Sequence, residues 1–212
     1  MRIPAEKGRI VARRVLAASV LVAIVLLVLL PPDRQLGDSL KLVLYHGASI
    51  WASMALISVA MVVGAVYLLR REPALVAWER GLRLVNVPLW LINTALGIVA
   101  MKLVWGGFLW SEPRMQMTFW ILLALGVGLL IDLIAERPWL AAAVDVVLGV
   151  VMWSLILLTP ELFHPDNPVL NSSSWTIKGL FFGIVAAVLV GASSVVTLLV
   201  PRDGHTVGRH ER

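Results

Sequence analysis

The chain has 212 residues, of which 59% are hydrophobic and only 15% are charged, and its formal net charge is +5. A soluble domain carries roughly 25% charged residues, so this composition excludes an ordinary soluble protein and predicts an integral membrane protein. Cysteine is absent, which excludes disulfides, thiolate metal ligands and thioether attachment of a cofactor on this chain.

Six apolar stretches follow one another along the chain, and they approach or exceed the ~20 residues that a helix needs to cross the hydrocarbon core. Helices are the ordinary way to satisfy backbone groups in lipid. We therefore predict an all-α fold, with residues 1–212 forming a single membrane domain of six transmembrane helices. The expected spans are residues 15–30, 40–69, 84–104, 116–134, 139–159 and 175–200.

The first stretch follows Arg13 and Arg14 and is short enough to resemble a signal peptide. It ends at Leu30 and two prolines without a small-residue cleavage site, so we interpret it as a membrane span.

The basic residues indicate how the bundle is oriented in the membrane. Thirteen lysines and arginines lie in the N-terminal tail, the 70–83 connection, the 135–138 turn and the C-terminal tail, against five on the opposite side. The positive-inside rule therefore places both termini in the cytoplasm. The same asymmetry explains the sequence pI near 10.2, and we predict no nucleic-acid binding from it.

This topology brings three unusual segments to the extracytoplasmic face. They contain His46, the aromatic and charged stretch "WGGFLWSEPR" at 105–114, and His164. The other two histidines, His205 and His210, lie in the polar C-terminal tail. Two histidines and an aromatic hinge at one membrane depth are the main functional signal of the sequence.

The residue types at this face suit haem. Two imidazoles can coordinate haem iron axially, whereas a structural zinc site needs four ligands, which are scarce without cysteine. Haem also requires a flat apolar wall and cations for its carboxylates, for which arginine is well suited. Candidates for the wall are Trp51, Trp105, Phe108, Trp110 and Trp175, and candidates for the cations are Lys102, Arg114 and Lys178.

Each feature also has a simpler interpretation. Tryptophan is enriched at membrane interfaces in any case, and a single interfacial histidine is more often a hydrogen-bonding surface residue. Gly106 and Gly107 can merely form a turn, and Glu112 and Arg114 can be a solvated pair of little energetic weight. The simpler interpretations are weakened because the features share one face.

The chain resembles the CcmC-type haem-handling proteins of cytochrome c maturation, and more distantly the CcsA-type proteins. Their outer loop reads approximately W-G-x-x-W-x-W-D-x-R between two outer histidines, and "WGGFLWSEPR" matches it without gaps. "LKLVLYHGASIWASMA" and "MWSLILLTPELFHP" correspond to the two histidine segments, and "SSSWTIKGLFF" corresponds to the start of the last span. The chain departs from the motif at Leu109 and Ser111, where the family has tryptophan, at Glu112, where it has Asp, and at Ala48, where it tends to have Pro.

The resemblance implies a haem carrier without a catalytic step, located in the inner membrane of a prokaryotic cell. Haem b would be bound axially by His46 and His164 on a platform formed by the loop. The platform residues would be Trp105, Gly106, Trp110, Glu112 and Arg114. The implied partners are a periplasmic haem chaperone of the CcmE type and ABC-type membrane proteins of the CcmA and CcmB type.

Three other functional interpretations stay open. A cytochrome b-like electron-transfer subunit usually places histidines inside its spans, and a small transporter should show interrupted helices near the midplane. A purely structural subunit without haem is also possible.

Asp145, within the fifth stretch, is expected either to make a contact between helices or with nearby water, or to have a function. Asn86 and Asn93 are expected to form hydrogen bonds between helices.

Overall fold

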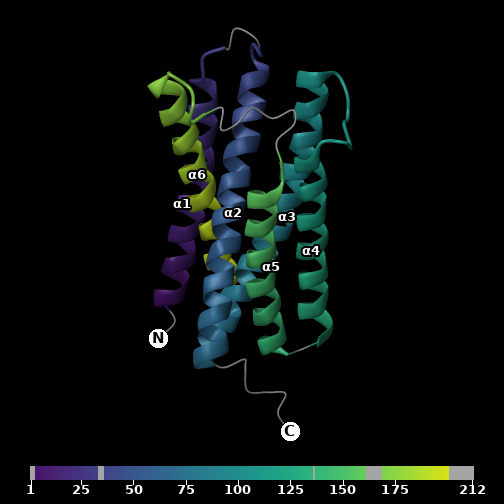
Figure 1. The fold of residues 1–212 in the computed structure, drawn as a ribbon. Coiled ribbons are helices and arrows are strands. Elements are labelled where there is room, and N and C mark those ends of the chain that lie inside the picture. Colours follow the sequence, from purple (N-terminus) through teal and green to yellow (C-terminus); the bar gives the residue numbers. More distant parts are fainter. Residues whose placement is uncertain (1–2, 33–35, 136, 161–168, 201–212) are drawn as a thin grey trace.

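The computed structural model describes residues 3–32, 36–135, 137–160 and 169–200, and six α-helices make up most of these residues (Figure 1). All six are long and apolar enough to cross a membrane, which confirms the predicted all-α membrane fold. The helices are α1 (Ile3–Val28), α2 (Ser39–Arg70), α3 (Pro73–Trp105), α4 (Pro113–Ala135), α5 (Pro138–Leu158) and α6 (Trp175–Leu199).

Local sequence signals explain where several helices begin and end. Prolines 73, 113 and 138 open α3, α4 and α5, where the missing N–H costs nothing and φ is already helical. Helix α6 is capped by Ser174, whose hydroxyl accepts a hydrogen bond from the Ile177 amide at 3.3 Å. Helix α3 ends at Gly106, which has a φ of 77° in the left-handed region.

The region 70–83, expected to connect two spans, is mostly helix, because α3 already begins at Pro73. Only Arg71 and Glu72 separate α2 from α3, and Arg83 is a buried residue of α3 with 2% exposure. The physical reason is pairing, because Arg83 lies between two aspartates and needs no water to balance its charge.

At 1.5 Å per residue, the 32 residues of α2 span about 48 Å, which is longer than the hydrocarbon core.

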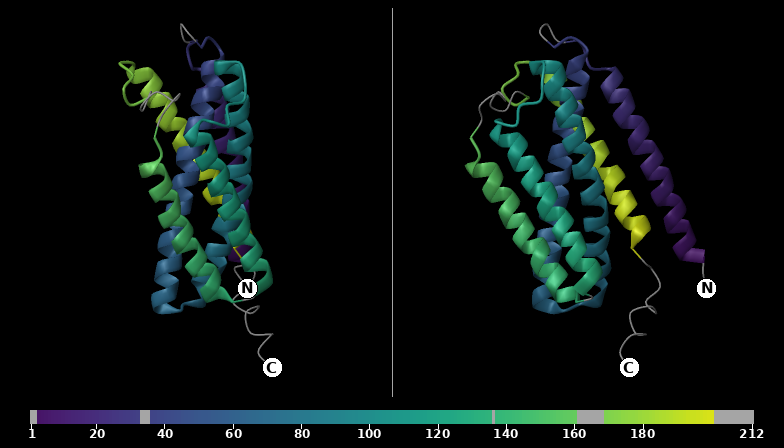
Figure 2. Two further views of the ribbon diagram at one scale, coloured as in Figure 1. Left: turned by 45° about the vertical axis from the view of Figure 1, so that its right-hand side comes forward. Right: turned by 90° about the vertical axis from the view of Figure 1, so that its right-hand side faces the viewer.

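Neighbouring helices run in alternating directions, so the connections gather at two ends of the bundle (Figures 1 and 2). We call the end with residues 29–32, 36–38 and 106–112 the loop end. The opposite end, with the start of α1, the α2–α3 and α4–α5 connections and the end of α6, is the tail end.

Helices α2 and α3 occupy the centre of the bundle. Helix α2 packs against α3, α5 and α6, and α3 also contacts α4. Helix α1 is peripheral and packs chiefly on α6, while α4 packs on α5. Two apolar clusters flank the central pair. One joins α2 and α3 to α4 and α5 around Trp90 and Ile121, and the other joins them to α6 around Leu56 and Val196.

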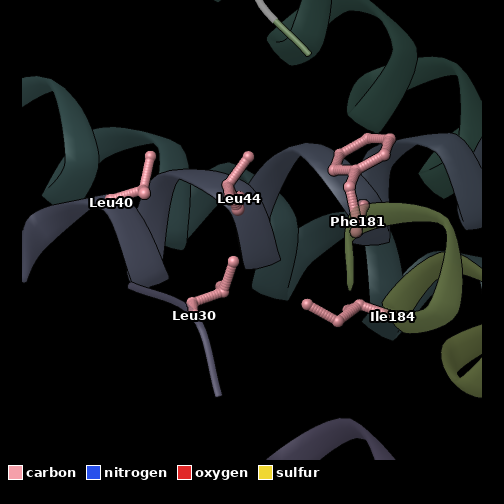
Figure 3. Close-up of a cluster of buried hydrophobic side chains, with 6 residues drawn as sticks. Leu30, Leu40, Leu44, Phe181 and Ile184 are labelled. Atoms are coloured by element: carbon pink, nitrogen blue, oxygen red, sulfur yellow. The ribbon is translucent and has the colours of Figure 1, made fainter. Parts of the chain in front are cut away.

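A third apolar cluster closes the loop end on the α6 side (Figure 3). Leu40 and Leu44 of α2 lie beside Phe181 and Ile184 of α6, and Leu30 reaches them from the segment after α1. Burial of each large apolar side chain contributes roughly 1.5–3 kcal/mol. This cluster therefore fixes the first turns of α2, which carry His46.

Candidate functional site

His46 lies two turns into α2 from the loop end, at the contact between α2 and α3. Its side chain is half-buried, and its backbone carbonyl accepts a hydrogen bond from the Ser49 hydroxyl at 3.0 Å. The imidazole lies against Gly97 of α3, since a Cβ built on that glycine would be 3.0 Å from His46 Cε1 and 3.3 Å from Nε2. Gly97 thus provides the space that the ring occupies.

Two methionines lie close to this histidine. The terminal methyl of Met115 is 3.7 Å from the same point above Gly97, so it borders the His46 ring. Met101 is buried one turn further along α3, and its sulfur accepts a hydrogen bond from the Leu109 amide at 3.1 Å. Met115 therefore borders the imidazole through its methyl group, while Met101 ties the loop to α3.

The loop 106–112 is held in place by backbone hydrogen bonds at both sides. The Gly106 amide donates to the Lys102 carbonyl at 3.1 Å, and the Glu112 amide donates to the Leu109 carbonyl at 3.2 Å. The Glu112 carbonyl then accepts from the Met115 and Gln116 amides at 3.1 and 3.2 Å, which starts α4. The loop is thus attached to the residue that borders His46.

Glu112 is fully enclosed, with 0% of its surface exposed. The alternative of a solvated surface pair with Arg114 is therefore wrong for Glu112, because its carboxylate is shielded from bulk water. Arg114 follows in the first turn of α4 and is half-buried, and its carbonyl accepts a hydrogen bond from the Thr118 hydroxyl at 2.9 Å. Burying an acid is costly unless its own contacts replace water. The burial of Glu112 therefore ties this end of the loop to the bundle.

The loop presents an aromatic surface. Trp110 is 51% exposed and Phe108 is 47% exposed, and their ring centroids are 6.2 Å apart. Trp110 also packs on Phe119 of α4 at 5.1 Å, and its carbonyl accepts a hydrogen bond from the Gln116 amide group at 2.8 Å. Trp105 is the half-buried last residue of α3. Two large rings therefore face outward from a fixed loop.

The other predicted aromatic residues form a second group on the α2–α6 side. Trp51 of α2 contacts Phe181 and Phe182 of α6 edge-on, each at 5.9 Å. Trp175 is 82% exposed at the start of α6, and the Lys178 ammonium lies 5.1 Å from its ring centre. These residues lie at the loop end, but their ring contacts are with α6 and not with the 106–112 loop.

The second predicted ligand, His164, lies outside the described residues, as do His205 and His210. Of the predicted site, the structure connects His46 to the loop only through Met115, which borders the ring and whose amide donates to the Glu112 carbonyl. The sequence interpretation missed Gly97, Met101 and Met115. The available signal was the glycine on the buried face of α3, although its register against His46 requires the packed structure.

A second polar cluster lies near the tail end, around Arg83 and Asp145. The Arg83 guanidinium donates to both carboxylate oxygens of Asp145, at 3.1 and 2.5 Å, and its third nitrogen is 3.1 Å from Asp132 of α4. Asp145 is therefore a contact between helices and is 2% exposed, which excludes the water-reached alternative. Asn93 donates to the Ser53 hydroxyl at 2.9 Å, which confirms its expected role between α3 and α2.

A comparison with protein-family models gives no match, and none of the curated proteins matches the chain significantly.

Proposed function

We propose that the protein is a membrane haem carrier, which binds haem b at the loop end and presents it to a haem chaperone outside the cytoplasm. The observation that carries the proposal is the position of His46. Its imidazole lies against a glycine at a helix contact, and the neighbouring loop exposes two aromatic rings. Imidazole is a common axial ligand of haem iron.

The orientation of the bundle supports an extracytoplasmic site. Arg70, Arg71 and Arg80 are exposed at or near the tail end, and Arg137 opens α5 at the same end. The positive-inside rule assigns such an end to the cytoplasm. The loop end, with His46, then faces the periplasm or the cell exterior.

The described side chains fit the chemistry of haem. When bound, haem supplies an iron with two axial positions and a flat apolar ring with two carboxylates. In the proposal His46 and His164 would hold the iron through their imidazoles. Arg114 would meet a carboxylate, while Trp105 and Trp110, with Gly106 and Glu112 shaping the loop, would offer the apolar surface.

The exposure of the loop supports transfer of haem to a partner. Trp110 and Phe108 are about half exposed and are held on a loop with many hydrogen bonds, and aromatic residues of this kind are enriched at protein interfaces. In the proposal a periplasmic chaperone of the CcmE type docks here, and ABC-type proteins of the CcmA and CcmB type act beside it in the inner membrane. The chain itself carries haem and breaks no bond in it.

An absorption spectrum of the detergent-purified protein tests the proposal. We expect the wild type to show a Soret band from bound haem, and His46→Ala and His164→Ala to weaken or shift it without lowering the folded yield. The double variant His205→Ala/His210→Ala is the matched control, because it removes the two tail histidines and should leave the spectrum unchanged.

Two results would contradict the proposal. One is a protein purified from haem-replete cells without haem, and the other is a spectrum that neither ligand substitution alters. A transfer assay separates a carrier from an electron-transfer subunit. A carrier should lose its Soret absorbance to an added chaperone of the CcmE type, whereas a resident cytochrome should retain it.

A further inference from the structure

The polar cluster near the tail end contains more acids than bases. Glu79 and Arg83 lie one turn apart on the buried face of α3, and Asp132 of α4 and Asp145 of α5 face them. Glu79, Arg83 and Asp145 are each 2% exposed. Asp145 is seven residues into α5, about 10 Å from its start, so the cluster lies inside the helical bundle and not at its very end.

The charges balance only when one carboxyl group is neutral. Arg83 is the enclosed base, and the exposed Arg80 reaches Asp132 at 3.7 Å. These two cations balance the charges of two carboxylates. Those two are Asp132 and Asp145, which already form ion pairs with the arginines. Glu79 is the third acid, and an uncompensated buried charge is expensive in a membrane.

The geometry around Glu79 identifies it as the neutral group. Its Oε1 atom is buried and has no hydrogen-bond partner among the described residues. A Cβ built on Gly64 of α2 would be 2.8 Å from this oxygen and 2.9 Å from the backbone carbonyl oxygen of Ala142 in α5. Both oxygens border the space beside Gly64, so this carboxyl oxygen is enclosed next to a carbonyl group and not next to a donor, which suits a protonated carboxyl group better than a carboxylate.

We propose that this cluster is a binding site for one proton, which resides on the Glu79 carboxyl group. The proton comes from water at the tail end, where Arg80 is exposed and Asp132 is partly accessible. The charged groups that act on Glu79 are Arg83 on its own helix, Asp132 on α4 and Asp145 on α5. Helix α2 contributes Gly64, which has no side chain to fill the space.

The proton site is independent of the proposed haem function, because it lies at the opposite end of the bundle. A metal ion fits the cluster less well, since no group of three His, Cys, Asp or Glu residues with metal-binding geometry occurs in the described part of the chain. The two aspartates are already engaged with arginine, which leaves one carboxyl oxygen facing one carbonyl.

Infrared spectroscopy of the purified full-length protein tests this proposal directly. At neutral pH the wild type should show the carbonyl stretch of a protonated carboxylic acid, and the band should shift after exchange into D2O. Glu79→Gln should remove the band while the protein stays folded, since the amide has the same shape and is neutral. Glu72→Gln, at the exposed start of α3, is the matched control and should retain it.

Stability gives a second readout. The folded protein would hold a proton that the unfolded chain releases at neutral pH, so wild-type stability should fall as the pH rises. Glu79→Gln should make this dependence weaker. The proposal is overturned when the wild type shows no carboxylic acid band, as a sodium-bound carboxylate would, or when the band survives in Glu79→Gln.

Discussion

The position of His46 depends on a single missing methyl group. Any residue other than glycine at position 97 would put a Cβ atom 3.0 Å from the imidazole, which is closer than ordinary van der Waals contact. The methyl group of Met115, from α4, lies 3.7 Å from the same point. The local geometry of the proposed ligand is thus set by a neighbouring helix and not by the motif around His46.

Gly97→Ala should therefore disturb haem binding without removing a ligand. The new methyl group would lie 3.0 Å from His46 Cε1, which forces the ring to move, and such overpacking costs about 1–3 kcal/mol. Where this cost falls on the haem-bound position of the ring, it corresponds to a roughly 5- to 140-fold loss of haem affinity, measured by haem titration of the apoprotein. Gly126→Ala of α4 is the control, because it lies outside the loop and a Cβ there meets nothing within 4 Å. Equal affinities in the two variants would contradict this account.

The Arg83–Asp145 pair leads to a prediction about stability. Arg83→Met should lower the free energy of unfolding by about 3–5 kcal/mol, because it leaves a buried carboxylate without its cation. The double variant Arg83→Met/Asp145→Leu should recover much of this loss, since both charges are then absent. Denaturant unfolding in detergent, followed by circular dichroism, measures the three proteins. Additive effects of the two substitutions would contradict a direct pairing.

At the level of the helices, α3 carries the polar positions of the bundle on one buried face. Glu79, Arg83, Asn86, Asn93 and Gly97 recur at intervals of three, four or seven residues, so they share a stripe. The stripe connects the charged cluster near the tail end with the histidine near the loop end. Its hydrogen bonds and ion pairs to α2, α4 and α5 fix the register of the central helix.

The contact between α2 and α5 depends on close approach at a second glycine. A Cβ on Gly149 would be 2.6 Å from the Cβ of Met61, an atom that cannot move without its helix. Gly149→Ala should therefore destabilise the protein by about 1–3 kcal/mol. Gly126→Ala, on an exposed face of α4 with nothing within 4 Å, should be neutral or stabilise by up to about 1 kcal/mol. Thermal unfolding of both variants measures the difference. Equal shifts of their unfolding temperatures would exclude the close contact.

The helices could be predicted from the sequence because lipid forces every long apolar stretch to satisfy its own backbone. The start of α3 could not be predicted, since hydropathy counts Glu79, Arg80 and Arg83 as loop residues. Hydropathy does not register that a charged side chain can be buried when its partner lies on another helix. The contacts of His46 with Gly97 and Met115 were missed for the same reason, because they depend on how three helices pack.

At the scale of the whole molecule, the two polar sites lie at opposite ends of one bundle. His46 and the aromatic loop lie near the loop end, and the charged cluster lies near the tail end. In our proposals one end handles haem outside the cytoplasm, and the other holds a proton supplied from inside. Both proposals therefore depend on the orientation of the chain in the membrane.

The absence of cysteine allows a clean test of that orientation. Phe108→Cys places a thiol in the exposed loop, and Glu72→Cys places one in the exposed α2–α3 connection. In spheroplasts, a membrane-impermeant maleimide should label Phe108→Cys before lysis and Glu72→Cys only after lysis, because the arginine-rich end faces the cytoplasm. The cysteine-free wild type is the control for background. The opposite labelling pattern would place His46 at the cytoplasmic face, where it could not deliver haem to a periplasmic chaperone.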